Sequence, residues 1–169
     1  MLTSLVLAAL TAAPATGLTT IRFDAPAPNF AIPSARGTRY LSDLRGKTVV
    51  IDFWASWCHV CTAELSDFVR AQQTYGDRVV VVTISDEPHD VAAAYLRQTN
   101  IQLPLIEDPD GIIHRVYSVP KIPVTLVLDP SGNVSYVSVG GENWEELSGA
   151  IERAQADSSA STLGAGVLQ

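Results

Sequence analysis

The two cysteines of the chain, Cys58 and Cys61, are separated by only two residues. An apolar, β-branched run ends at Phe53, and apolar residues with helical spacing begin after Cys58. A cysteine at a helix N-terminus faces unpaired N–H groups and the positive end of the helix dipole, and both favour the thiolate over the thiol. Cys61 follows within one helical turn, close enough for its sulfur to bond to that of Cys58. The pair is therefore predicted to cycle between a dithiol and a disulfide.

Two other roles for these cysteines are weaker interpretations of the sequence. A purely structural disulfide here would close a very short loop, which removes little entropy from the unfolded chain. A metal site made of Cys58, His59 and Cys61 is disfavoured, because a helix directs adjacent side chains apart. His89 and His114 lie in unrelated parts of the sequence, and we expect both to be solvated loop or helix residues.

Length and charge limit the remaining classes of protein. The chain has 169 residues, 47% of them hydrophobic and 17% charged, a mixture that suits one globular domain. Eighteen acidic residues against eleven basic ones give a formal net charge of −7. The chain therefore offers no basic surface for a nucleic acid or an anionic membrane, and neither is an expected partner. We expect a monomer.

The N-terminus resembles an export signal. Residues 1–20 carry no charged side chain, and an apolar stretch over residues 5–13 is followed by Ala13-Pro14-Ala15, a small-x-small pattern that permits cleavage after Ala15. The stretch is shorter than the ~20 residues that cross a bilayer, so no membrane span is expected after processing. We predict a signal peptide over residues 1–15, a folded domain over 16–154 and a flexible tail over 155–169.

Alternating strand and helix patterns predict the elements that position the cysteines. Short apolar runs typical of buried strands cover residues 48–53, 79–84 and 124–129, and a more polar run over 134–139 suits an edge strand. Helical patterns cover residues 58–75, 90–98 and 143–154. In the second of these helices we expect Val91, Ala94 and Tyr95 to face inward. This order of elements predicts an α/β fold.

Five stretches of the sequence resemble the thioredoxin superfamily, and within it the exported TlpA/ResA-like thiol-disulfide oxidoreductases. They are Ala-Pro-Asn-Phe at 27–30, Tyr-Leu-Ser-Asp-Leu-Arg-Gly-Lys at 40–47, Phe-Trp-Ala-Ser-Trp-Cys-x-x-Cys at 53–61, Asp-Pro-Asp-Gly at 108–111 and Val-Pro-Lys-Ile-Pro-Val-Thr at 119–125. The resemblance implies a thioredoxin-like fold, a central mixed β-sheet flanked by helices with an N-terminal extension. It also implies that no organic cofactor or metal is required, since another dithiol protein supplies the reducing equivalents.

The same resemblance assigns a substrate platform to Pro123. In this family the proline before the later strand is cis and packs beside the cysteines, and the backbone at Ile122 and Val124 pairs with a substrate segment. An X–Pro bond adopts the cis form far more easily than other peptide bonds, although Pro120 could compete for this role. Trp57 should cover one side of the cysteine pair and tune access to it.

Two acidic residues are candidates for proton transfer. Asp52 stands where thioredoxins carry a buried acid, and Glu64 stands where the TlpA/ResA-like branch carries its acid. A buried carboxyl poised near neutral pH can accept and return a thiol proton. If both approach the same sulfur, they should titrate jointly. The alternatives are a first-turn acid favoured by the helix dipole for Glu64 and an acid bonded to a buried backbone group for Asp52.

The residues between the cysteines depart from the family pattern. Val60 stands where many relatives have proline, so it offers an N–H that proline lacks. His59 could add a titrating charge beside Cys58. Both residues are therefore expected to tune the redox chemistry, although they leave the direction of electron flow open.

The sequence thus predicts an extracytoplasmic, periplasmic oxidoreductase that reduces specific protein disulfides. The resemblance makes cytochrome c maturation and copper-site assembly plausible client pathways. Two alternatives remain: a peroxiredoxin-like peroxidase, although Ala55 occupies the position where that class needs Thr, and a module that binds Cu(I) through Cys58 and Cys61.

Overall fold

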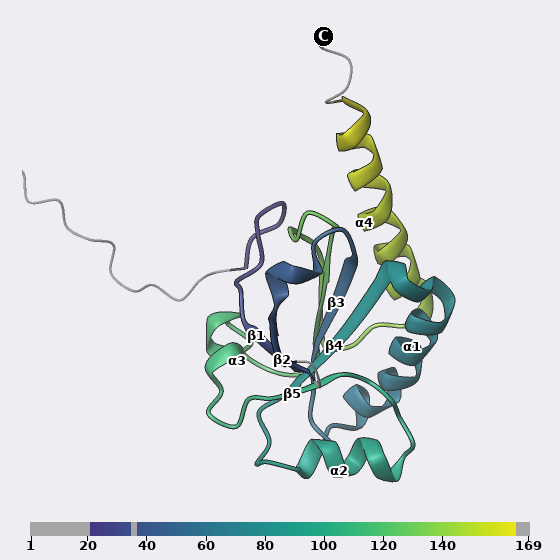
Figure 1. The fold of residues 1–169 in the computed structure, drawn as a ribbon. Helices are drawn as coiled ribbons and strands as arrows, with labels where there is room; N and C mark the ends of the chain where they lie inside the picture. Colours follow the sequence, from purple (N-terminus) through teal and green to yellow (C-terminus); the bar gives the residue numbers. More distant parts are fainter. Residues whose placement is uncertain (1–20, 35–36, 165–169) are drawn as a thin grey trace, which may run out of the picture.

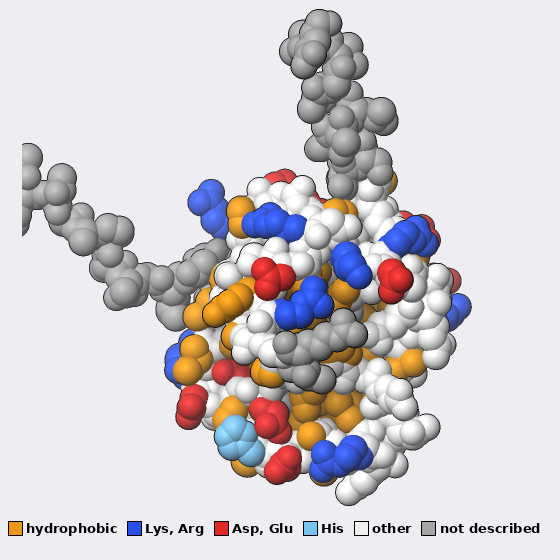
Figure 2. Space-filling model, in the orientation of Figure 1, with side chains coloured by type: hydrophobic (Ala, Val, Ile, Leu, Met, Phe, Trp, Pro, Cys, Tyr) orange, Lys and Arg blue, Asp and Glu red, His pale blue; other side chains and the backbone are white. Residues whose placement is uncertain are grey.

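The computed structural model describes residues 21–34 and 37–164. Figure 1 shows the arrangement of their backbone, and Figure 2 shows the side chains on the same face, where acidic and basic groups are interspersed. The predicted signal peptide, residues 1–15, lies outside the described residues, as does the end of the predicted tail, residues 165–169.

A five-stranded sheet with the order β5-β4-β3-β6-β7 forms the centre of the fold. Its strands are β3 (Thr48–Phe53), β4 (Val79–Ser85), β5 (Leu105–Glu107), β6 (Val124–Leu128) and β7 (Val134–Val139). β4 pairs in parallel with β3 and β5, whereas β6 is antiparallel to β3 and β7. The predicted mixed α/β sheet is confirmed, and β7 lies at its edge as its polar pattern indicates.

Each face of the sheet has its own apolar core, because successive side chains of a strand point to opposite faces. Val50 of β3 packs with α1 (His59–Tyr75), α2 (Val91–Gln98) and α4 (Trp144–Gly164). Its neighbours Val49 and Ile51 pack on the other face, with Phe30 of the N-terminal segment and Tyr117 beside the short helix α3 (Ile112–Val116). Figure 1 shows α1 and α4 on one side of the sheet and α3 on the other.

The ends of the long helices follow from their sequences. Cys58 is the N-cap of α1. Before α4, Asn143 and Glu146 form the expected capping box: Asn143 Oδ1 accepts the Glu146 N–H at 3.1 Å, and Glu146 Oε2 accepts the Asn143 N–H at 3.0 Å. α4 continues to Gly164, so the backbone is helical where the sequence suggested a tail from residue 155. Extending an established helix adds one hydrogen bond per residue and needs no apolar stripe.

Several short elements are absent from the sequence-based description. The N-terminal extension folds into a hairpin of β1 (Ala31–Ser34) and β2 (Gly37–Tyr40), followed by the 3₁₀ turn η1 (Leu41–Leu44). β5 and α3, with three and five residues, are too short to show a period.

The inward face of α2 differs in part from the prediction. Tyr95 packs inward as predicted, edge-on to the buried Trp54 with ring centroids 5.7 Å apart. Ala92 and Leu96 are buried, whereas Val91 is 41% exposed and Ala94 is partly buried. The helix has only eight residues, so several stripes fit its sequence equally well and the packing partner decides between them. Within residues 21–34 and 37–164, no helix is both long enough and apolar enough to span a bilayer.

The corrected face of α2 can be tested by two truncations. Leu96→Ala removes a buried side chain, so we expect the free energy of unfolding to fall by about 2–4 kcal/mol. Val91→Ala, on the exposed face of the same helix, should change it by less than about 0.5 kcal/mol. Urea unfolding of both variants measures the difference. If Val91→Ala lowers the free energy of unfolding more than Leu96→Ala does, Val91 faces inward as the sequence predicted.

Candidate active site

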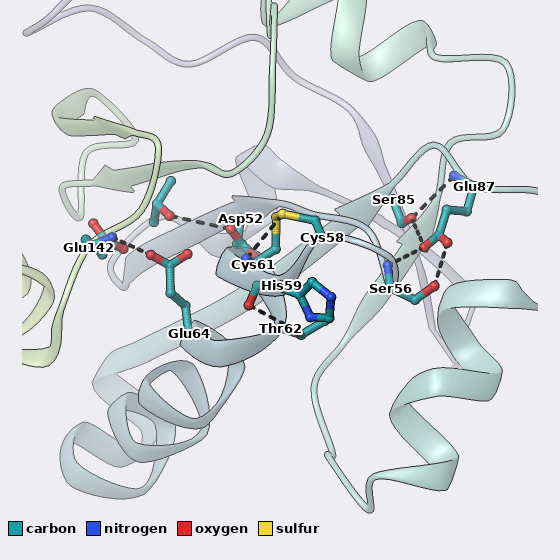
Figure 3. Close-up of a disulfide and its surroundings, with 11 residues drawn as sticks. Asp52, Ser56, Cys58, His59, Cys61, Thr62, Glu64, Ser85, Glu87 and Glu142 are labelled. Atoms are coloured by element: carbon teal, nitrogen blue, oxygen red, sulfur yellow. Dashed lines mark hydrogen bonds between the residues drawn. A yellow bond between two sulfur atoms is a disulfide. The ribbon is translucent and has the colours of Figure 1, made fainter.

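The cysteine pair lies at the edge of the sheet where β3 ends and β6 begins. Phe53, the last residue of β3, pairs with Val124, the first residue of β6, which directly follows Pro123. The segment from Phe53 to Cys58 and the segment around Pro123 therefore start from neighbouring points. The structure joins Cys58 and Cys61 in a disulfide with a Cα–Cα distance of 5.3 Å (Figure 3).

The two cysteines differ in exposure. Cys58 is half-buried at the N-cap of α1, whereas Cys61 is 0% exposed inside the first turn. The N–H of Cys61 points at Cys58 Sγ, 3.3 Å away. A thiolate at Cys58 would keep this donor together with the positive end of the helix dipole. The more exposed sulfur of the pair is thus also the one that the helix terminus stabilises as an anion.

A buried acid that the sequence analysis missed fixes the turn before Cys58. Glu87 Oε2 accepts the backbone N–H of Ser56 at 2.8 Å, and Glu87 Oε1 accepts the Ser56 hydroxyl at 2.6 Å. Ser85, at the end of β4, donates its hydroxyl to Glu87 at 3.1 Å. The parallel pairing of β3 and β4 brings both strand ends to the same edge, which is the signal that could have identified this contact.

Asp52 lies at the centre of the sheet beneath the site. Its side chain is fully buried, and Thr125 of the neighbouring β6 donates its hydroxyl to Asp52 Oδ1 at 3.4 Å. Oδ2 has no hydrogen-bond partner. Burial raises the pKa of Asp52 well above its ordinary value, and the charges of Glu64 and Glu142 raise it further against the Thr125 hydrogen bond.

Glu64 lies one turn after Cys61 on α1 and turns away from solvent. Its Oε1 accepts the backbone N–H of Glu142, and its Oε2 has no partner. Burial raises the pKa of Glu64, the hydrogen bond from Glu142 acts in the opposite direction, and the charge of Asp67 raises it. Neither the sequence pattern nor the family resemblance pointed to Glu142, because it follows β7 in a loop far along the chain.

The segment around Pro123 has the predicted form. The Ile122–Pro123 peptide bond is cis, and Pro123 is buried while Ile122 is half-buried. The Pro123 carbonyl accepts the N–H of Gly140 at 3.0 Å, which ties this segment to the loop after β7.

Two surface hollows flank the cysteine pair. Trp57, which is 69% exposed, lines one of about 290 Å³ together with Lys121 and Ile122. His59 and Val60, both exposed, line another of about 610 Å³ with Glu64 and the loop at 140–143. A partner could therefore contact four of the predicted site residues, Trp57, His59, Val60 and Ile122.

His114 is buried, contrary to the expectation of a solvated residue. Its Nδ1 lies 2.8 Å from Asp108 Oδ2, and its ring packs edge-on against Phe53 with centroids 4.9 Å apart. Asp108 also accepts the backbone N–H of Ile112 at the start of α3, so the cap and the imidazole share one carboxylate. His89 lies on the surface beside Glu107, as expected.

The described residues contain no group of three or more His, Cys, Asp or Glu arranged to hold a metal ion. The site brings together two sulfurs and the buried carboxyls of Asp52 and Glu64. The thioredoxin-like fold and its Cys-x-x-Cys disulfide at the start of α1 define the class of thiol-disulfide redox proteins.

Residues 23–137 match the AhpC/TSA family, and the chain belongs to this family. The thioredoxin-like protein YneN of Bacillus subtilis is 29% identical over 126 residues, which cover 72% of this chain and 74% of YneN. The thiol-disulfide oxidoreductase ResA of Bacillus cereus is 28% identical over 130 residues, 75% of each chain. The structure of the pneumococcal exposed lipoprotein thioredoxin Etrx1 from Streptococcus pneumoniae has a TM-score of 0.62 and 28% identity, over 75% of this chain and 99% of Etrx1. The similarity to ResA inferred from the motifs is confirmed.

The raised pKa of Asp52 makes a prediction about stability. The folded protein keeps a proton on Asp52 where the unfolded chain has released it, so this carboxyl lowers the free energy of unfolding as the pH rises above about 4. Asn carries no such penalty, so Asp52→Asn should stabilise the oxidised protein by at least about 1 kcal/mol at about pH 8. The gain should shrink toward about pH 4.

Urea unfolding of the oxidised protein at both pH values measures this effect. Asp77→Asn replaces an exposed acid outside the site and serves as the control. Equal stability of Asp52→Asn and wild type at the higher pH would mean that folding does not raise the pKa of Asp52.

Proposed function

We propose that the protein reduces specific protein disulfides outside the cytoplasm by dithiol-disulfide exchange at Cys58 and Cys61. The observation that carries this proposal is the asymmetry of the pair, in which a half-buried sulfur at a helix N-terminus is bonded to a fully buried one. Such an arrangement gives the two cysteines separate tasks, attack on the substrate and resolution of the intermediate. The similarity to ResA supports the same chemistry.

In this mechanism the Cys58 thiolate attacks one sulfur of a substrate disulfide. The substrate S–S bond breaks, one substrate thiolate leaves, and a mixed disulfide forms at Cys58. Cys61 then gives up its proton, and its thiolate attacks Cys58 Sγ. The bond between Cys58 and the substrate breaks, and the second substrate thiolate leaves. The substrate is reduced, and the protein is left with the disulfide seen in the structure.

The surrounding residues serve this sequence of steps. Asp52, buried in β3, and Glu64, buried on α1, accept the proton of Cys61. Trp57, Pro123 and the backbone of Ile122 hold the substrate segment beside Cys58, as a strand-like addition that pairs with Ile122. His59 and Val60, exposed between the cysteines, tune the stability of the thiolate and the approach of the partner.

The proposed reaction takes place outside the cytoplasm. Etrx1, a similar protein, is described as an exposed lipoprotein, which supports an extracytoplasmic, periplasmic location. Residues 1–15 would act as the signal peptide, and a second dithiol protein would return electrons to Cys58 and Cys61. Clients in cytochrome c maturation or in copper-site assembly fit this chemistry, because both need reduced cysteines.

Serine variants separate the tasks of the two cysteines. Cys58→Ser should reduce turnover of a disulfide substrate to background, because no exposed nucleophile remains. Cys61→Ser should retain the attack but trap the mixed disulfide, since nothing resolves it. Non-reducing gels and mass spectrometry detect the adduct. An adduct formed by Cys58→Ser and none by Cys61→Ser would reverse the assignment.

The reduction potential of the pair tests the direction of electron flow. A dedicated reductant should equilibrate with glutathione or dithiothreitol mixtures well below about −200 mV. A value near about −120 mV would identify an oxidant instead. A pair that shows no reversible transition but retains Cu(I) through dialysis would support the copper-binding alternative.

A further inference from the structure

The loop between β7 and α4, residues 140–143, lies directly against the first turn of α1. Gly141 has a φ of +109°, and a Cβ at this position would come within 2.7 Å of Glu64 Oε1 and 2.8 Å of Val60 Cγ1. Ser138 holds the Gly141 carbonyl with a hydrogen bond of 3.0 Å. Only glycine permits this approach, so the loop is built to bring the following residue, Glu142, to the buried face of α1.

Glu142 joins the two acids that the sequence had already indicated. Its backbone N–H donates to Glu64 Oε1, and Figure 3 shows its side chain on the same side of the disulfide as Asp52 and Glu64. Among the described residues, four carboxyl oxygens of these three side chains are buried without a hydrogen-bond partner: Asp52 Oδ2, Glu64 Oε2, Glu142 Oε1 and Glu142 Oε2. Three charged carboxylates buried close together are costly, so burial and mutual repulsion favour their protonated forms.

We propose that Glu142 is a positioning residue for proton transfer: a third buried carboxyl that shares protons with Glu64 and Asp52 and so sets the pH range in which Cys61 is deprotonated. The inference rests on the proposed dithiol function of Cys58 and Cys61. Glu142 acts through the other two acids, and its backbone N–H fixes the orientation of Glu64 at the same time.

The electrostatics of the cluster agree with this role. Burial raises the pKa of Glu142 to about 7. The nearby Thr125 hydroxyl opposes this change, and the charge of Glu64 adds to it. In turn, the charge of Glu142 raises the pKa of Asp52. The three groups therefore titrate as one coupled unit.

Other titratable groups surround the cluster on several elements. Tyr136 of β7 and Glu146 of α4 interact with Glu142, and Asp67 of α1 interacts with Glu64. His59 lines the same hollow as Glu142. The acids add negative charge near Glu142, and their effect favours retention of its proton.

The proton balance of resolution shows how Glu142 acts. The thiol proton of Cys61 passes to a carboxylate of the cluster as the Cys61 thiolate attacks Cys58 Sγ, and the substrate sulfur leaves with the electron pair of the broken bond. A negative charge on Glu142 opposes formation of the Cys61 thiolate and holds protons on Asp52 and Glu64. Neutral glutamine at position 142 should therefore permit resolution at lower pH.

The resolution step can be measured with dithiobis-nitrobenzoate as the substrate, because this small aromatic disulfide reacts without a client protein. Attack by Cys58 releases a first nitrothiolate, and resolution by Cys61 releases a second, which is recorded by rapid mixing across a pH series. We expect the rate of the second phase to rise with pH. In Glu142→Gln the midpoint, the pH at which this rate reaches half its maximum, should be lower than in wild type by roughly half to one unit. Glu145→Gln, a neighbouring exposed acid, is the matched control and should keep the wild-type midpoint.

A Glu142→Gln midpoint equal to that of wild type overturns the inference, as does an equal shift in Glu145→Gln. Absence of the second phase from wild type would instead contradict the proposed function. Infrared difference spectra of the oxidised proteins provide a readout without turnover. A carboxyl that titrates near pH 7 should be present in wild type and Glu145→Gln and absent from Glu142→Gln, and its persistence in Glu142→Gln also overturns the inference.

Discussion

The pairing of β3 with β4 on one side and β6 on the other determines where the cysteines, the substrate platform and Asp52 lie. β3 and β4 run in parallel, so the turn before Cys58 and the segment that carries Glu87 leave the sheet at one edge. β6 runs in the opposite direction, so Pro123 enters at that same edge. The register also places Thr125 opposite Asp52, inside the sheet. Cysteines, substrate platform and buried acid are thus consequences of one set of backbone hydrogen bonds.

The acids of the site are held at some expense to stability. A carboxyl in the middle of an apolar sheet loses its hydration, and neighbouring carboxyls add repulsion. The fold tolerates them because a protonated carboxyl is far less costly to bury than a charged one. This condition makes the acids useful, since a group that holds its proton near neutral pH can exchange it with a thiol. Instability and function here have the same physical origin.

The sequence was sufficient for features that depend on local pattern. Periodicity predicts the buried strands and the edge strand, and cap chemistry predicts the capping box at Asn143. The spacing of the two cysteines identifies them as a redox pair. The sequence could not reveal Glu142, because its burial depends on how a glycine loop packs against a helix some eighty residues earlier. The burial of His114 was not predicted for a similar reason, since it depends on packing against the ring of Phe53, some sixty residues earlier in the chain. The helix α2 is so short that its sequence pattern did not determine which residues face inward.

The burial of Cys61 beside an accessible Cys58 also bears on oxidative damage. A peroxide that reaches the site meets Cys58 first and converts its thiolate to a sulfenic acid. Cys61 lies within bonding distance and can condense with that sulfenic acid, with loss of water, before further oxidation to the irreversible sulfinic and sulfonic forms. The product is the same disulfide that the normal reaction forms, and the same reductant can reopen it. The geometry that resolves a mixed disulfide therefore also protects the exposed sulfur from permanent loss.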